Sequence, residues 1–198
     1  MSIIDKTLKF YSDNCDILFE RYEKANLEQI DNYLLNIVKK DNYILELGFG
    51  SGREIKFLYD NGFYNIYGID GCGKFVEKAK ERFTNNNFYV STLPNIDIPQ
   101  NLKFDLIYSI AVWMHLPTPI YEETIKNIVS KLKLNGKILI SYSLEERKEN
   151  ERYFQKVDDT LLEQLFTKYK IQKIDEFITT DSLNRNINWK NQLYKMNS

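Results

Sequence analysis

Three glycines stand at alternate positions, Gly48, Gly50 and Gly52, directly after a short apolar run at residues 43–47. The run has the length of one buried strand, and the apolar spacing after Gly52 becomes helical. Glycine has no Cβ, so a unit of strand, glycine loop and helix can bring bare backbone N–H groups close to a ligand near the helix start. This stretch therefore predicts a ligand-binding loop.

A carboxylate ends the next apolar run. Residues 65–70 have the pattern of a second strand that finishes at Asp70, where nucleoside-binding α/β units place an acid that accepts hydrogen bonds from ribose hydroxyls. The alternative is that Asp70 only caps the helix beginning near Gly73. The glycine spacing departs from the dinucleotide fingerprint, because the third glycine comes one residue early and Arg53 stands in its place. Nicotinamide oxidoreduction is therefore disfavoured.

With these residues the sequence resembles the class I S-adenosylmethionine-dependent methyltransferases, and within them a small bacterial branch. Four motifs in order carry the resemblance, at residues 46–52, 68–70, 104–117 and 135–140, and it extends from about residue 10 to the C-terminus. It implies S-adenosyl-L-methionine as cofactor and S-adenosyl-L-homocysteine as product, with the glycine loop at the methionine end and Asp70 at the ribose. Relatives often place an acid after the third strand for the adenine, where this chain has Ser91 and Thr92. The implied cofactor residues are Glu46, Gly48, Gly50, Gly52, Arg53, Asp70, Gly71, Ser91, Thr92, Leu93 and Ser109.

Alternating strand-like and helix-like runs predict a Rossmann-like α/β fold, with a mostly parallel seven-stranded sheet and helices on both faces. We expect one domain over residues 1–198, with N-terminal helices in 1–40 and the core in 41–198. Residues 7–40 predict two helices, the first capped by Asp13. The resemblance adds an antiparallel C-terminal hairpin. Strands are expected at 43–47, 65–70, 87–91, 104–109, 136–142, 171–178 and 188–195, and later helices at about 52–61, 73–84 and 121–133 and from Asp158 onward.

The charge balance and residue counts exclude several classes of function. The chain has 27 basic and 28 acidic residues, a net charge of −1, which argues against a general polyanion binder. Cys15, Cys72 and a single histidine make a His/Cys zinc site improbable and suggest reduced thiols. No secretory or membrane-spanning run is present. We expect a cytoplasmic protein that binds neither DNA nor membranes; RNA and the oligomeric state stay open.

The acceptor side is predicted from topology. Ligands of open α/β sheets bind beyond the carboxyl ends of the strands, which places His115 and Trp113 there. His115 is a candidate base, because an imidazole titrates near pH 6.5; the alternative is that it only orients its loop or caps the helix near Thr118. The residues 143–153 are densely charged, and arginine suits carboxylate or phosphate recognition. The candidate acceptor residues are Tyr11, Trp113, Arg147, Arg152 and Arg185.

The missing motifs narrow the reaction. The loop after the fourth strand has no Asn or Asp followed by Pro-Pro and an aromatic residue, and no Pro-Cys pair, so methylation of DNA bases is disfavoured. The leading prediction is an enzyme that transfers a methyl group to oxygen or nitrogen of a small, possibly acidic, molecule. The alternatives are a tRNA or protein methyltransferase and a module that binds the cofactor without catalysis.

Overall fold

The strands of the chain form one twisted sheet. The structure is a computed structural model, and it describes residues 1–84, 87–147, 151–183 and 185–196. Within these ranges seven strands lie in the order β3-β2-β1-β4-β5-β7-β6. Strand β7 runs antiparallel to both of its neighbours, β5 and β6, and the other strand pairs are parallel. The expected fold class is confirmed. The strands are β1 (Ile44–Leu47), β2 (Ile66–Asp70), β3 (Phe88–Val90), β4 (Phe104–Ile110), β5 (Leu132–Ser143), β6 (Ile171–Thr180) and β7 (Asn188–Met196).

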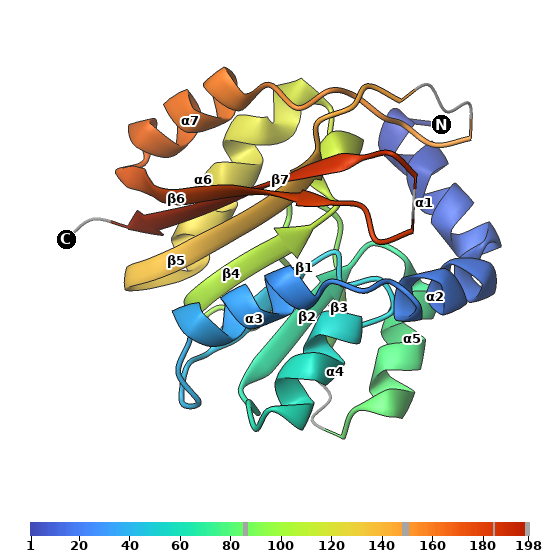
Figure 1. Ribbon diagram of the computed structural model, residues 1–198, viewed down its shortest axis with the longest axis horizontal. Helices are drawn as coiled ribbons and strands as arrows, with labels where there is room; N and C mark the ends of the chain where they lie inside the picture. The colour runs from blue at the N-terminus through green and yellow to red at the C-terminus, as the bar shows by residue number, and fades with distance from the viewer. Residues whose placement is uncertain (85–86, 148–150, 184, 197–198) are drawn as a thin grey trace.

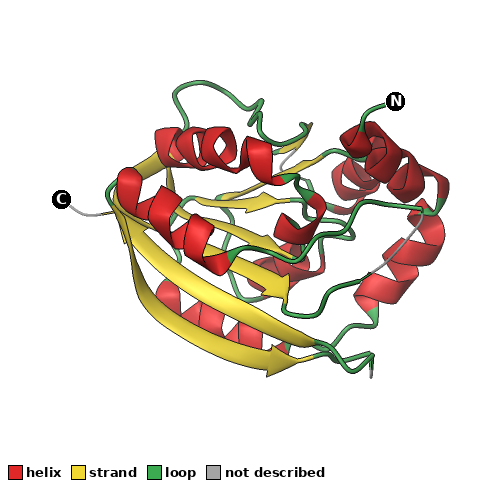
Figure 2. Cartoon of the chain, turned by 90° about the horizontal axis from the view of Figure 1, so that it is seen from above, coloured by secondary structure: helices red, strands yellow, loops and turns green. Residues whose placement is uncertain are grey.

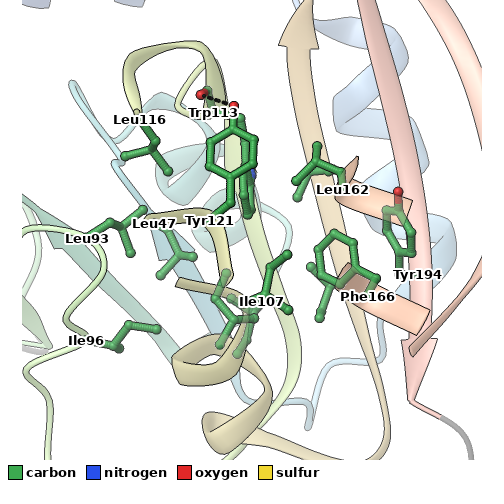
Figure 3. Packing of buried hydrophobic residues seen from close by; sticks show 14 of the residues in the cluster. Leu47, Leu93, Ile96, Ile107, Trp113, Leu116, Tyr121, Leu162, Phe166 and Tyr194 are labelled. Atoms are coloured by element: carbon green, nitrogen blue, oxygen red, sulfur yellow. Dashed lines mark hydrogen bonds between the residues drawn. The ribbon is translucent and has the colours of Figure 1, made fainter. Parts of the chain in front are cut away.

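Helices cover both faces of the sheet, as Figures 1 and 2 show. Successive residues of a strand point to opposite faces, so β1 contributes Ile44 to one apolar cluster and Leu45 to the other. The first cluster also contains residues of α3 (Glu28–Ile37), α4 (Arg53–Asp60) and α5 (Gly73–Arg82). The second, drawn in Figure 3, contains residues of α6 (Tyr121–Lys131) and α7 (Asp159–Lys168). Two short 3-10 turns, η1 (Trp113–His115) and η2 (Thr118–Ile120), precede α6.

The N-terminal segment forms three helices, and the prediction of two was wrong. They are α1 (Ile3–Asp13), α2 (Cys15–Glu23) and α3. The two predicted helices correspond to α2 and α3, and α1 was not predicted. The expected cap, Asp13, is the last residue of α1, and the N-cap position of α2 is Asn14, with φ −109° and ψ 17°. The N-cap of α1 is Ser2, which forms a capping box with Asp5.

The first two helices, α1 and α2, lie beyond the edge of the sheet at which the parallel strands end (Figure 1). Thr7 of α1 accepts a hydrogen bond from the backbone N–H of Tyr153, at 3.0 Å. Lys74 of α5 donates to the carbonyl of Ser12, at 2.8 Å. The turn between β6 and β7 reaches the same edge. These contacts cover the carboxyl ends of the strands with chain from both termini. In the described ranges, the helices are all too short or too polar to cross a bilayer.

Candidate active site

A cavity of about 250 Å³ lies at this covered edge of the sheet. Its volume approaches that of typical ligand pockets, roughly 300–1,000 Å³. The glycine loop, the end of β2 and η1 form its floor, while α1, α2 and the β6–β7 turn contribute walls. The predicted site residues that line it are Tyr11, Glu46, Gly48, Gly50, Arg53, Asp70, Gly71, Ser91, Thr92, Leu93, His115, Arg147, Arg152 and Arg185.

The glycine loop and Asp70 are joined by hydrogen bonds. Gly48 and Gly50 have φ values of 70° and 54°, a region in which a side chain costs roughly 1–2 kcal/mol. The Gly50 N–H donates to Asp70 Oδ2 at 2.9 Å, and the Cys72 N–H donates to Oδ1 at 2.8 Å. Cys72, not Asp70, is the N-cap residue of α5. The Asp70 carboxylate therefore faces the cavity between two loops, with lone pairs left on both oxygens. Gly52 is the N-cap of α4 and lies outside the cavity wall.

Burial raises the pKa of Asp70 to about 6, against the opposing effect of its two backbone hydrogen bonds. A folded-state pKa above the ordinary value of 3.8 adds stability below pH 4, and this contribution is lost as the pH rises through 6. Relative to low pH, ionisation of this buried carboxylate therefore lowers the free energy of unfolding of the ligand-free protein by about 3 kcal/mol near neutral pH. A ligand that donates hydrogen bonds to Asp70 offsets part of that cost.

Glu46 and Arg53 form the wall beside the glycine loop. Glu46 accepts a hydrogen bond from the Tyr108 hydroxyl at 2.8 Å, and its burial raises its pKa well above the ordinary range. Arg53 donates to the carbonyl of Ala25 at 2.8 Å and contacts the Glu54 carboxylate. These bonds hold the guanidinium at the cavity with little freedom, because its side chain is only 14% exposed.

The loop after β3 contributes a compact wall. The Ser91 hydroxyl accepts from the Asp97 N–H at 2.9 Å, and its single proton is shared between the carbonyl of Asn95 and the carboxylate of Asp97, at 3.1 Å each. These bonds hold the shape of the loop. Thr92 and Leu93 stand beside it at the cavity, so a planar ring bound there meets apolar surface and hydroxyl groups and no ionised carboxylate of this loop segment.

His115 takes part in a chain of hydrogen bonds. Its Nδ1 lies 2.8 Å from the carbonyl of Tyr153, and its Nε2 lies 2.9 Å from the Tyr11 hydroxyl. A carbonyl can only accept, so Nδ1 carries a proton, and when the ring is neutral Nε2 accepts from the Tyr11 hydroxyl. Arg152 Nη1 donates to the same Tyr11 hydroxyl at 2.8 Å. The imidazole is thus oriented toward the cavity in the tautomer that can take up a proton, and it also anchors the loop at Tyr153.

Trp113 and Ser109 lie away from the cavity, contrary to their prediction as acceptor and cofactor residues. Trp113 is 1% exposed and packs against Tyr121 and Phe166 in the core shown in Figure 3. Its indole N–H donates to the Ser109 hydroxyl at 3.0 Å. The physical reason is the tight turn η1, in which neighbouring side chains point in different directions: Trp113 points into the core and His115 toward α1.

Aromatic rings and arginines form the wall on the β5–β7 side. The guanidinium of Arg147 lies 4.9 Å from the ring centre of Phe154 and 5.5 Å from that of Trp189. The guanidinium of Arg152 lies 4.8 Å from the ring centre of Phe154. Stacking on aromatic faces orients guanidinium groups for planar recognition of acids. Residues 148–150 of the predicted charged stretch lie outside the described residues.

Arg185 is held by an acid of its own turn. Its Nε and Nη2 donate to the two oxygens of Asp181, at 3.0 and 2.6 Å. This pairing lowers the pKa of Asp181 to about 2. Trp189 donates to the same carboxylate at 3.2 Å. Arg185 reaches the cavity, but its charge is neutralised locally, in contrast to the independent anion-binding group that the sequence suggested.

Several lining residues were not predicted. Tyr22, Phe154 and Ser141 face the cavity from α2, from the segment after β5 and from β5 itself. Their types are common in apolar cores and strands, and no sequence motif marks them. Only the topology could have identified Ser141, since it stands at the carboxyl end of a parallel strand.

Known proteins resemble this chain at the level of family and fold. A family model described as "Methyltransferase domain" matches residues 19–185. A phosphoethanolamine N-methyltransferase of Plasmodium falciparum (isolate 3D7) is 30% identical over 139 residues, which are 68% of this chain and 52% of the relative. The chain thus spans about half the length of that curated relative.

Two solved structures share the fold. A chain in the complex between the Haloferax volcanii Trm112 methyltransferase activator and a putative methyltransferase has a TM-score of 0.76 at 14% identity, covering 100% of this chain and 98% of the other. The Burkholderia thailandensis 1,6-didemethyltoxoflavin-N1-methyltransferase, with 1,6-didemethyltoxoflavin and S-adenosylhomocysteine bound, has a TM-score of 0.65 at 13% identity, covering 86% and 76%.

Proposed function

This chain belongs to the class I S-adenosylmethionine-dependent methyltransferases, and we propose that its cavity holds the cofactor across the ends of β1 and β2. The observation that carries the proposal is the Asp70 carboxylate, which faces the cavity and is bonded to the N–H of Gly50 in the glycine loop. Asp70 accepts from the ribose hydroxyls, and Arg53 binds the carboxylate at the methionine end. Thr92 and Leu93 contact the adenine. The residues fit such a group, since the cavity brings together the glycine loop, an acid suited to ribose hydroxyls and an arginine suited to a carboxylate.

The acceptor binds on the far side of the cavity, over β4, β5 and β7. It is a small molecule with an acidic group, which Arg152 recognises from its position on the ring of Phe154, with Arg147 on the same ring. Two comparisons support a small acceptor. The curated relative is a phosphoethanolamine methyltransferase, and a structural neighbour holds 1,6-didemethyltoxoflavin.

The reaction is a direct displacement at carbon. When bound, S-adenosylmethionine supplies an electrophilic methyl group on a sulfonium, which leaves as a neutral thioether. The protein aligns the acceptor atom with that carbon, and such alignment contributes up to roughly 7–11 kcal/mol in ideal cases. In the ligand-free protein Tyr11, held by Arg152, fills the lone pair of His115 Nε2. The O–H or N–H of the acceptor replaces the Tyr11 hydroxyl at Nε2, which then accepts the proton while Nδ1–H stays bonded to the Tyr153 carbonyl. The direct test is transfer of labelled methyl from S-adenosylmethionine to a panel of small acids.

Cofactor affinity depends on pH through Asp70. Ribose hydroxyls donate to the ionised carboxylate, and in the free protein this group takes up a proton below about pH 6. We expect the affinity for S-adenosylhomocysteine, measured by calorimetry, to fall up to tenfold per pH unit below 6 and to stay level above 7. Asp70→Asn, which cannot ionise, should bind more weakly and lose this pH dependence. A flat profile in the unmodified protein contradicts the role of Asp70.

Arg152→Gln tests the acceptor side. Removing the guanidinium that hydrogen-bonds to the acid of the acceptor weakens acceptor binding by roughly 1.5–3 kcal/mol. We therefore expect the acceptor KM to rise tenfold or more. The affinity for S-adenosylhomocysteine stays within twofold. Arg152→Lys is the matched variant, because it keeps the charge but loses the planar fork. Its acceptor KM should therefore lie between those of the unmodified protein and Arg152→Gln. Loss of cofactor binding in Arg152→Gln contradicts the assignment.

A further inference from the structure

The aromatic ring of Tyr22, on α2, covers the glycine loop. Tyr22 lines the cavity, and one edge of its ring lies on Gly50: a Cβ added to Gly50 would stand 3.3 Å from Tyr22 Cδ2 and 3.5 Å from Cε2. The ring of Phe75 packs beside it, with 6.3 Å between the two ring centres. The position of the Tyr22 ring at the cofactor loop is therefore fixed by contacts on both sides.

The hydroxyl end of Tyr22 points to the other half of the cavity. Burial raises the pKa of Tyr22, the Arg152 guanidinium and the Tyr11 hydroxyl oppose this effect, and the Asp70 carboxylate adds to it. The side chain is therefore a neutral phenol near neutral pH. Tyr11 also contacts His115 Nε2, at 2.9 Å. The ring of Tyr22 thus spans the boundary between the glycine loop and the groups that face the acceptor.

The sulfur of a bound cofactor lies at the same boundary. The Gly50 N–H donates to Asp70 Oδ2 at 2.9 Å, so a ribose held by Asp70 lies beside Gly50. In S-adenosylmethionine a single carbon joins the ribose to the sulfur, and the methionine chain continues from the sulfur to the carboxylate that Arg53 binds. The sulfur therefore comes close to Gly50 and to the ring that covers it.

We propose that the ring of Tyr22 binds the positively charged sulfonium of S-adenosylmethionine. The face of a neutral aromatic ring carries partial negative charge and attracts cations, an effect that corresponds to roughly 2- to 30-fold in affinity. The inference rests on the proposed function, to which it adds a residue that distinguishes the cofactor from its product.

Methyl transfer removes the charge that Tyr22 recognises. The methyl carbon forms its new bond to the acceptor, and both electrons of its bond to sulfur stay on the sulfur, which becomes a neutral thioether. The attraction between sulfur and ring is lost in the same step. Tyr22 therefore favours the reactive cofactor over S-adenosylhomocysteine and promotes release of the product.

The test compares the affinities of S-adenosylmethionine and S-adenosylhomocysteine, measured by calorimetry without an acceptor. We expect the ratio of the two affinities to fall roughly 3- to 30-fold in Tyr22→Leu, because only the first ligand carries the charge. A merely structural role would lower both affinities together and leave the ratio unchanged. Tyr22→Phe is the matched variant: it keeps the face of the ring and loses only the hydroxyl, so its ratio should stay within twofold of the unmodified protein.

Phe154→Leu is the control for an aromatic ring elsewhere in the cavity. Its ring already has the guanidinium groups of Arg147 and Arg152 close to it, at 4.9 and 4.8 Å from the ring centre, and it stands on the acceptor side. The ratio of the two affinities in this variant should also stay within twofold of the unmodified protein.

Two further probes separate the charge of the ligand from the shape of the ring. Sinefungin carries an ammonium group on carbon in place of the methylated sulfur, so its affinity should change with that of S-adenosylmethionine across the variants. Replacement of Tyr22 by 4-cyanophenylalanine keeps the shape of the ring but withdraws electrons from its face. The ratio should therefore be lower than in Tyr22→Phe, and this comparison stands even if the leucine variant does not fold.

Several outcomes overturn the proposal. They are a fall of less than threefold in folded Tyr22→Leu, an equal fall in Tyr22→Phe or Phe154→Leu, a sinefungin affinity that follows S-adenosylhomocysteine, and a 4-cyanophenylalanine variant with the ratio of Tyr22→Phe. In each of them both nucleosides still bind, so the proposed function survives. If neither nucleoside binds the unmodified protein, the proposed function fails and this inference fails with it.

Discussion

Asp70→Ala should reduce the affinity for S-adenosylhomocysteine by roughly 10²–10⁴-fold. Two hydrogen bonds from ribose hydroxyls to the carboxylate are worth roughly 1.5–3 kcal/mol each, and the variant also releases the Gly50 and Cys72 amides that position the two loops. The effect should appear in calorimetric titration and as loss of methyl transfer at ordinary cofactor concentrations. It is the largest binding effect expected of any single carboxylate in the cavity.

Asp105→Ala is the matched control for this result. Asp105 also accepts a backbone N–H, that of Tyr43 at 2.8 Å, but it lies outside the cavity. The Asp105→Ala variant should bind S-adenosylhomocysteine with the affinity of the unmodified protein, although its free energy of unfolding is lower. If Asp70→Ala is folded and its affinity lies within threefold of the unmodified protein, the ribose does not meet Asp70, and the placement of the cofactor over β1 and β2 is wrong.

His115→Ala should slow methyl transfer by roughly 10²–10⁴-fold, the range for a general acid–base group. Affinity for S-adenosylhomocysteine should stay within a few-fold, because His115 faces α1 and the acceptor side, away from the ribose acid. Single-turnover measurements with saturating cofactor separate this rate loss from a binding defect. Tyr11→Phe should give a smaller loss, since it removes only the hydroxyl that contacts Nε2.

A merely structural role for His115 predicts a different outcome. His115→Ala also breaks the bond to the Tyr153 carbonyl, so a rate loss alone does not prove proton transfer. Added imidazole should restore part of the rate if the missing group is a base, because the small ring can occupy the vacated space and accept the proton. Unchanged turnover in His115→Ala, or a loss that imidazole leaves untouched, argues against the base.

The sheet, and the cavity wall formed by the glycine loop and Asp70, could be predicted from the sequence because their signals are local. The apolar run, the glycine loop and the next strand with its acid lie within residues 43–70, and each strand end dictates where its loop must lie. The N-terminal helices were harder. The two predicted helices correspond to α2 and α3, whereas α1 was missed, because Thr7 is its one buried residue and no buried apolar face marks this helix.

The opposite side of the cavity could be predicted only in outline, because its contacts join distant parts of the chain. Tyr11 meets both His115 and Arg152 through the topology of the fold and not through spacing in the sequence. Trp113 and His115 lie two residues apart, yet one is core and the other faces the cavity. Their separation depends on the direction of one 3-10 turn, which residue type does not specify.

The most direct test of the central claim is a crystal structure of the protein with S-adenosylhomocysteine. The account predicts the ribose hydroxyls within hydrogen-bond distance of both Asp70 oxygens, the methionine end beside the glycine loop and Arg53, and the sulfur directed toward His115 and Ser141. A nucleoside bound elsewhere, or a ribose that contacts no oxygen of Asp70, would contradict it.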